Sequence, residues 1–209
     1  VGEPPAISTE PESAIACEIG TTVEFNVSVT TNDSVIYSWF YSTANQPNTW
    51  IEITDNNEYS GSNSAKLIIS DVKLSMDGNK YRVEVSTNEY ACIQTTNDDT
   101  TLIVEESLPT ANQIEDVIVC DNNSVGDDKD GFIATFNFEN YIPDILGNDQ
   151  SQDDFTVTFH LSKNSSEDLD DNGISFPFSN TIANSQKIFV RVMSNKTECF
   201  NSDSSFNAV

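Results

Sequence analysis

Apolar and polar side chains alternate one for one along much of this 209-residue chain. In residues 23–29, Val or Phe occupies every second position, and the pattern recurs in 37–41, 81–85 and 155–161. A period of two is typical of β-strands that bury one face, whereas the three- and four-residue apolar spacing of helices hardly occurs. The sequence therefore predicts an all-β protein built from short strands.

The length of the chain fits two domains of about one hundred residues each. Residues 107–110, Ser-Leu-Pro-Thr, interrupt the strand pattern and contain a proline. We expect a short linker here, with one domain at 1–107 and a second at 108–209. Seven or so short strands in the first half predict a two-sheet β-sandwich.

The second half also contains segments with strand character. They are residues 114–119, 132–138, 155–161, 188–193 and 206–209. Pro143 limits the segment 141–146 to a single helical turn, since proline is tolerated only at the start of a helix. We therefore expect the second domain to be a β-sandwich as well.

The charge of the chain excludes some partners. Asp and Glu number 34 and Lys and Arg number 9, for a net charge of −25. This balance provides no attraction to nucleic acid or to anionic lipid, so we expect neither nucleic-acid binding nor membrane insertion. No apolar stretch approaches the roughly 20 residues that span a bilayer, and the first residues lack a signal-peptide pattern. The chain is expected to be a piece of a longer precursor.

Four cysteines, Cys17, Cys92, Cys120 and Cys199, allow three pairings. Pairing within each half closes two loops of similar length, so we predict the disulfides Cys17–Cys92 and Cys120–Cys199. Paired cysteines in small acidic β-rich domains favour an oxidising compartment. The alternative is four buried free thiols in a cytosolic protein.

Residues that could support catalysis are scarce. His160 is the only histidine, and it alternates with Phe159 and Leu161, so we expect it to face solvent. No nucleophile or orienting carboxylate is implied by its spacing, and one histidine beside four committed cysteines leaves no tetrahedral zinc set. We predict that the chain is not an enzyme, with an unrecognised hydrolase as the remaining alternative.

One polar loop carries the oxygen ligands that a hard cation prefers. Its candidate calcium ligands are Asp121, Asn123, Asp127, Asp128 and Asp130, and Gly131 ends the loop. The spacing of an EF-hand is absent. A second acidic run, 167–173, could add ligands. The alternative is a solvated acidic loop without an ion.

Several motifs of the first half resemble a known family. They include Trp39, Thr49-Trp50, Tyr59-Ser60-Gly61, residues 65–69 and residues 76–82. Over residues 6–105 they resemble the immunoglobulin-like repeats of large secreted surface proteins of Bacteroidetes. The resemblance implies a Trp39 packed between two sheets. The chain differs from immunoglobulin domains at one point, because valines, Val27 and Val83, stand near the positions of the usual disulfide between the sheets.

The second half, 108–209, resembles an adhesin-type repeat of gliding-associated and type IX secreted proteins of the same bacteria. The motifs that carry this likeness are residues 119–121, 130–132, 136–138, 156–160, 188–192 and 199–200. The resemblance implies a sandwich of the immunoglobulin, fibronectin or cadherin kind.

The two resemblances together imply a non-catalytic module pair at the cell surface, outside the outer membrane. It would act as a stalk or adhesive segment, with a surface glycan or protein and neighbouring repeats of the same polypeptide as partners. The alternative is a carbohydrate-binding accessory region of a secreted polysaccharide-degrading enzyme. That alternative requires an exposed aromatic platform, for which Phe40, Trp50 and Tyr59 are candidates.

Overall fold

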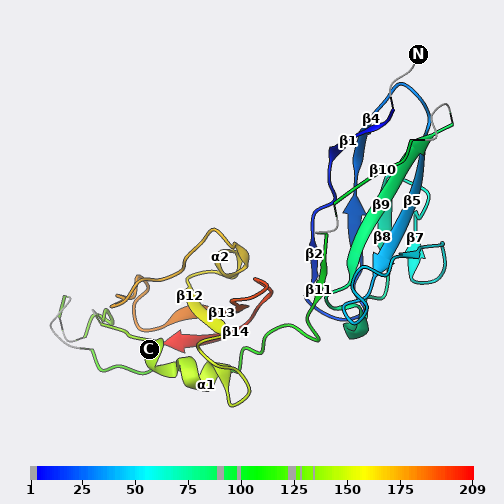
Figure 1. Cartoon of the computed structure of the whole chain (residues 1–209). Helices are drawn as coiled ribbons and strands as arrows, with labels where there is room; N and C mark the ends of the chain where they lie inside the picture. The colour runs from blue at the N-terminus through cyan, green and yellow to red at the C-terminus, as the bar shows by residue number, and fades with distance from the viewer. Residues whose placement is uncertain (1–3, 89–91, 98–99, 122–125, 128, 134) are drawn as a thin grey trace. The chain divides into compact units, whose positions relative to one another are not determined.

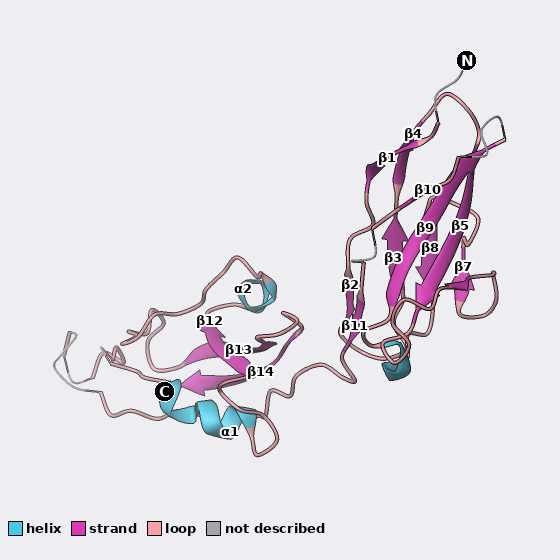
Figure 2. Ribbon diagram, in the orientation of Figure 1, coloured by secondary structure: helices cyan, strands magenta, loops and turns pink. Residues whose placement is uncertain are grey.

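The computed structural model describes residues 4–88, 92–97, 100–121, 126–127, 129–133 and 135–209. The chain forms two compact units, Val1–Ser107 and Leu108–Val209. Strands dominate both units and the helices are short (Figures 1 and 2). The predicted all-β class is confirmed.

One sheet of the first unit is centred on strand β8 (Lys66–Ile69), which pairs antiparallel with β3 (Val23–Asn26) and β7 (Tyr59–Ser60). After Val27 the chain continues as β4 (Ser28–Thr30), which pairs with β1 (Ala6–Thr9). In β3 the apolar positions are buried and the polar ones exposed, as the alternation predicts.

The second sheet of the first unit has the order β10-β9-β5-β6. These strands are β5 (Val35–Ser42), β6 (Ile51–Glu52), β9 (Lys80–Thr87) and β10 (Gln94–Thr95). Beside the start of β9, a bridge between Lys80 and Thr101 leads into β11 (Leu102–Val104), which pairs parallel with β2 (Ala14–Ala16). The 3₁₀ turn η1 (Leu74–Met76) precedes β9. Because β1 pairs within one sheet and β2 beside the other, the unit has the immunoglobulin-like arrangement.

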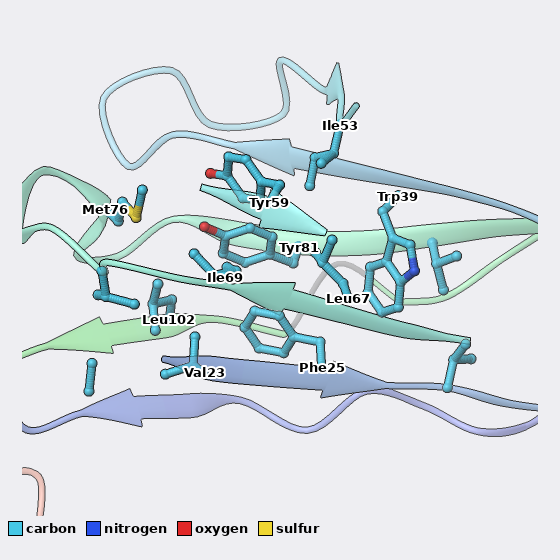
Figure 3. Close-up of a cluster of buried hydrophobic side chains, with 14 of the residues drawn as sticks. Val23, Phe25, Trp39, Ile53, Tyr59, Leu67, Ile69, Met76, Tyr81 and Leu102 are labelled. Carbon is cyan, nitrogen blue, oxygen red and sulfur yellow. The ribbon is translucent and has the colours of Figure 1, made fainter. Parts of the chain in front are cut away.

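The core of the first unit lies between these sheets (Figure 3). Trp39 is fully buried, and its indole nitrogen donates to the Ser64 carbonyl oxygen at 2.8 Å. The rings of Phe25 and Tyr81 stack with centroids 4.7 Å apart. Val27 and Val83 are both buried in this core, so aliphatic packing replaces a disulfide between the sheets.

The second unit contains one antiparallel sheet of order β12-β13-β14. Its strands are β12 (Phe155–His160), β13 (Gln186–Ser194) and β14 (Phe200–Ala208). Val117 bridges to Ala208 at the outer edge of β14. The expected single helical turn is present as α1 (Ile142–Leu146), which follows the 3₁₀ turn η2 (Glu139–Tyr141).

Phenylalanine rings fill the core of the second unit. The Phe138 ring lies 5.1–6.0 Å, between centroids, from five other rings: Phe136, Phe159, Phe176, Phe178 and Phe206. Among the described residues of the expected strand 132–138, only Phe136 makes a β-bridge, to Phe178. Asn137 explains the early end, since its side-chain oxygen accepts the Glu139 N–H and turns the chain into η2.

Helix α2 (Lys163–Glu167) packs on the sheet and contacts all three strands (Figure 1). The Lys163 ammonium donates to the Ser202 carbonyl oxygen of β14 at 2.6 Å. Both faces of the sheet are therefore covered. In the described part of the chain, no helix has the length and apolar character to cross a membrane.

Candidate functional site

The oxidation states of the cysteines differ from the prediction. Cys17 and Cys199 are disulfide-bonded, whereas Cys92 and Cys120 are exposed free thiols. The predicted disulfides Cys17–Cys92 and Cys120–Cys199 are both wrong.

In the first unit, the two members of the predicted pair lie at opposite ends of the sandwich. Cys17 follows Ala16, which pairs with Val104, and the Val104 N–H donates to Asp77 just before β9 begins. Cys92 lies between β9 and β10, beyond the other end of β9. Eight residues of β9 span about 26 Å, whereas a disulfide requires Cα atoms within about 7 Å.

The second unit separates its predicted pair in the same way. Cys199 directly precedes β14, and its carbonyl oxygen accepts the Ser194 N–H in the turn from β13. Cys120 follows Val119, whose N–H donates to the carbonyl oxygen of Val209, just past the other end of β14. Nine residues of β14 lie between these ends, which is about 30 Å.

The carboxylates of the predicted calcium loop accept backbone N–H groups. Asp121 accepts from Gly131, and Asp130 accepts from both Asp127 and Phe132. Asp127 accepts from Lys129. Asn123 and Asp128 lie outside the described residues. Among the residues that are described, no three His, Cys, Asp or Glu side chains group to hold a metal. Calcium binding stays a prediction.

The expectation that His160 faces solvent is wrong. Its side chain has an exposed fraction of 0%, whereas Leu161, expected to be buried, is 46% exposed. The strand carries Phe159 on the phenylalanine side of the sheet and His160 on the opposite side. That opposite side is covered by α2 and by the chain that follows it, which periodicity alone does not reveal.

His160 is held by hydroxyl groups at both ring nitrogens. Nε2 lies 2.8 Å from the Thr158 hydroxyl and Nδ1 lies 3.0 Å from the Ser165 hydroxyl. Ser165 donates its hydroxyl hydrogen to Asp171. Nδ1 must therefore carry the imidazole proton and donate to Ser165, while Nε2 accepts from Thr158.

Arg191 lies beside this cluster and is 3% exposed. Its guanidinium donates to the carbonyl oxygens of Asp168 and Asp171, at 2.6 and 2.8 Å. Strand β13 thereby holds both ends of the turn that follows α2. A charged residue between Val190 and Val192, within the apolar run 188–193, is the sequence signal that could have revealed this group.

The environment of the cluster shifts two pKa values. Burial, and then the positive charge of Arg191, lower the pKa of His160, and Asp171 opposes this only in part. The hydrogen bonds from Ser165 and from the Gly173 N–H lower the pKa of Asp171. At neutral pH the imidazole is therefore neutral and the carboxylate is ionised.

The order of these groups differs from a hydrolytic triad. In such a triad the histidine stands between the nucleophilic hydroxyl and the carboxylate. Here Ser165 stands between His160 and Asp171, and it gives its proton to the carboxylate. The cluster is arranged to hold the chain after α2.

A cavity of about 440 Å³ opens next to the cluster. His160, Ser165 and Asp171 are among the residues that line it, together with Ile174 and Pro177. A second cavity of about 350 Å³ shares Ile174 and Ser175 with the first. These cavities flank the place where the chain crosses the free edge of β12 and the Ile174 N–H donates to Phe159.

The aromatic side chains proposed for sugar stacking do not form one platform. Tyr59 is buried in the first core. The guanidinium carbon of Arg82 lies 4.3 Å from the centre of the Trp50 ring and 5.6 Å from that of Phe40. The Trp50–Phe40 pair therefore packs around an arginine.

Comparison with protein families identifies one similarity. Residues 116–208 match the family model of the Flavobacterium inter-domain disulphide bond domain. The match lies within the second unit and includes the bonded Cys199 and the free Cys120. No curated protein matches the chain.

Several solved structures are similar to the chain. The N-terminal four immunoglobulin domains of Dscam1 isoform 4.44 share 14% identity at a TM-score of 0.45, over 100% of this chain and 46% of that one. An I-band fragment of titin shares 16% identity at a TM-score of 0.40, over 99% of this chain and 65% of the titin fragment. A twitchin kinase fragment of C. elegans shares 17% identity at a TM-score of 0.32, over 48% of this chain and 21% of the twitchin fragment. The chain spans less than half of the Dscam1 structure, and similarity at this level says nothing about function.

Proposed function

We propose that this chain is a non-catalytic pair of extracellular modules from a large bacterial surface protein, in which a disulfide between Cys17 and Cys199 ties the two units together. One observation supports the tie above all others. Each unit contributes one bonded cysteine and one free thiol. The family model that residues 116–208 match, the Flavobacterium inter-domain disulphide bond domain, agrees by its name with such a bond.

A disulfide of this kind fits an extracellular location. Disulfides persist where the surroundings are oxidising and are rare in the cytosol. The net charge of −25 would keep the exposed sheet edges of such modules from associating. Type IX secretion and an association with gliding rest on the sequence resemblance alone.

The tie gives a stalk a specific mechanical property. When force acts on the two ends of the chain, a bond between Cys17 and Cys199 carries the load past everything between them. Only residues 1–17 and 199–209 can then be drawn out, which amounts to about 100 Å at roughly 3.5 Å per residue. Without the bond the whole chain can extend to about 700 Å.

Single-molecule force spectroscopy on the chain held by its ends tests this function. Under oxidising conditions we expect an extension of about 100 Å, and after reduction two unfolding steps that add up to the full contour length. The Cys17→Ser variant should behave like the reduced protein without any reductant, while Cys92→Ser serves as the matched control. Full extension of the oxidised protein contradicts the tie.

The adhesive role requires a surface glycan or protein as partner, and neighbouring repeats of the same polypeptide as attachment points. Binding of the purified chain to whole bacterial cells, before and after removal of surface glycans or proteins, tests this part. Binding that neither treatment reduces contradicts a glycan or protein partner, and no binding to the cells contradicts an adhesive role and leaves the stalk as the function.

A further inference from the structure

The cavity beside His160 has the form of a small-molecule site. Its volume of about 440 Å³ lies within the range of about 300–1,000 Å³ that ligand pockets occupy. Its wall combines polar side chains, among them Ser165 and Asp171, with the apolar side chains of Ile174 and Pro177. The Asp171 side chain is 39% exposed, so a ligand can reach its carboxylate.

The charge around the cavity favours a neutral ligand. Among the described residues that line it, none is Lys or Arg, so an anion would find no counter-charge in this acidic protein. The single lining carboxylate, that of Asp171, has the Arg191 guanidinium nearby, bonded to the carbonyl oxygen of the same residue. The positive charge of Arg191 offsets a part of the attraction that Asp171 would exert on a cation.

The wall of the cavity is fixed in place. Arg191 holds the carbonyl of Asp171, and the Asp171 carboxylate accepts the Gly173 N–H at 2.7 Å. The Ile174 N–H donates to Phe159 at 2.7 Å, and Phe178 exchanges two backbone hydrogen bonds with Phe136. A binding site held this firmly loses little conformational entropy when a ligand enters.

The buried polar groups behind the wall are costly for the fold. Burying a guanidinium demands compensation, and Arg191 Nε is buried without a hydrogen-bond partner. In return, Arg191 holds one surface segment, the turn between Asp168 and Asp171. Such an arrangement is typical of a site whose shape matters.

We propose that this cavity binds a pyranose sugar ring. The Asp171 carboxylate accepts hydrogen bonds from ring hydroxyls, the exposed Ser175 hydroxyl adds a donor and an acceptor, and Ile174 and Pro177 contact the C–H face of the ring. The ligand is a free sugar or the end of a glycan chain. This inference is independent of the Cys17–Cys199 tie, so its failure would leave the proposed stalk unaffected.

Amide NMR spectra of the ¹⁵N-labelled chain, titrated with sugars, test the proposal. The probes are the methyl glycosides of glucose, galactose and N-acetylglucosamine, and a tetrasaccharide of each. With at least one of them we expect saturable shifts confined to Leu161 and residues 171–179. A tetrasaccharide that binds about tenfold tighter than its methyl glycoside identifies a glycan chain, and equal affinity identifies a single sugar.

Three variants, each checked for an amide spectrum that shows an intact second unit, assign the binding to the cavity. Asp171→Asn should weaken binding about tenfold because it removes a charged acceptor. Ser175→Trp fills the cavity and should abolish binding. Asp149→Asn removes the same charge from an exposed loop and should bind like the parent.

Three outcomes would overturn the proposal. They are the lack of saturable shifts with every sugar, shifts that persist in Ser175→Trp, and tighter binding of butylamine or acetate than of any sugar. The last outcome would show a charged ligand instead.

Discussion

The two units bury their apolar side chains in different ways. The first packs Trp39, Phe25 and Tyr81 between two sheets, whose ladders satisfy the backbone. The second packs its phenylalanine rings between one three-stranded sheet and segments with little regular structure. Those segments need other partners for their polar groups.

This difference explains where the ionisable side chains are buried. The second unit buries His160 and Arg191 against its sheet, and both hold the chain between α2 and residue 175. In the described part of the first unit, no Asp, Glu, Lys, Arg or His side chain is buried to the same degree. Where the described residues of the second unit form no second sheet, side-chain hydrogen bonds replace part of the ladder, and these shape a cavity.

The Phe138→Ala variant tests whether one cluster of phenylalanine rings stabilises the second unit, and it should have the largest effect on stability. Removing the ring that contacts five others should lower the free energy of unfolding of this unit by about 4 kcal/mol. Urea unfolding followed by NMR measures the loss. Trp39 and Trp50 are the only tryptophans and lie in the first unit, so their fluorescence should report an unchanged transition. A shift of both transitions would show that the units unfold together.

The Arg191→Met variant tests whether side-chain hydrogen bonds hold the turn after α2 against the sheet. It leaves the carbonyl oxygens of Asp168 and Asp171 without their donor, so we expect a loss of about 3 kcal/mol in the second unit. Arg191→Lys should recover little of this loss, because an ammonium lacks the planar fork that reaches both carbonyls. Hydrogen exchange of residues 163–175 should accelerate in both variants. Protection equal to the parent would refute the role of Arg191.

The Gly173→Ala variant tests the crossing over the edge of β12. Gly173 has a φ of +78°, and an added Cβ would lie 2.4 Å from the Phe159 carbonyl oxygen. We expect a loss of about 2 kcal/mol in melting experiments. Gly20 is the matched control in the first unit, since it has a φ of +81° but open space around the added Cβ, whose nearest atom lies at 3.9 Å. Equal losses for the two alanine variants would show that backbone conformation alone sets the cost.

Addition of calcium tests whether the second unit, unlike the first, is stabilised by an ion bound to the loop of Asp121, Asp127 and Asp130. If the loop binds the ion, millimolar Ca²⁺ added after chelation should raise the melting temperature of the second unit by several degrees, equivalent to about 1 kcal/mol. Asp130→Asn should remove the increase. Melting curves that coincide with and without calcium would exclude the site.

Acidification should have the smallest effect on stability, and it should lower the stability of the second unit through His160. The folded pKa of His160 lies below the ordinary value of about 6.5, so the unfolded chain takes up the proton first. The contribution of neutral His160 is complete above pH 6.5 and is lost as the pH falls from 6.5 through the folded pKa. His160→Gln should flatten the stability of the second unit in this window, measured against the parent. An imidazole NMR titration with a midpoint above 6.5 would contradict the account.

The sequence allowed prediction of those features that depend on local periodicity. The alternation at 23–29 identified β3 and β4, and Pro143 identified the short α1. The strand expected at 132–138 was largely wrong because Phe136 and Phe138 pack as rings in a core without a continuous ladder. The same alternation misplaced His160, since it cannot show that both faces of a sheet are covered.

The cysteine pairs could not be predicted from their separation. Loop length describes the entropy of closure, whereas bonding requires that the Cα atoms come close. Each predicted pair lies at the two ends of one strand, β9 or β14, and only the register of the sheets shows this. Likewise, Ser165 within α2 and Asp171 in the turn after it both reach His160, which no spacing rule predicts.

Cleavage between the units tests the central claim most directly. A protease site inserted between Ser107 and Leu108 separates the backbone of the two units. After cleavage, a denaturing gel without reductant should show a single species of full mass, and the same sample with reductant should show two halves. In the Cys17→Ser variant the halves should separate without reductant. If the halves of the unreduced parent separate on that gel, no bond joins Cys17 to Cys199 and the account of a tied pair is wrong.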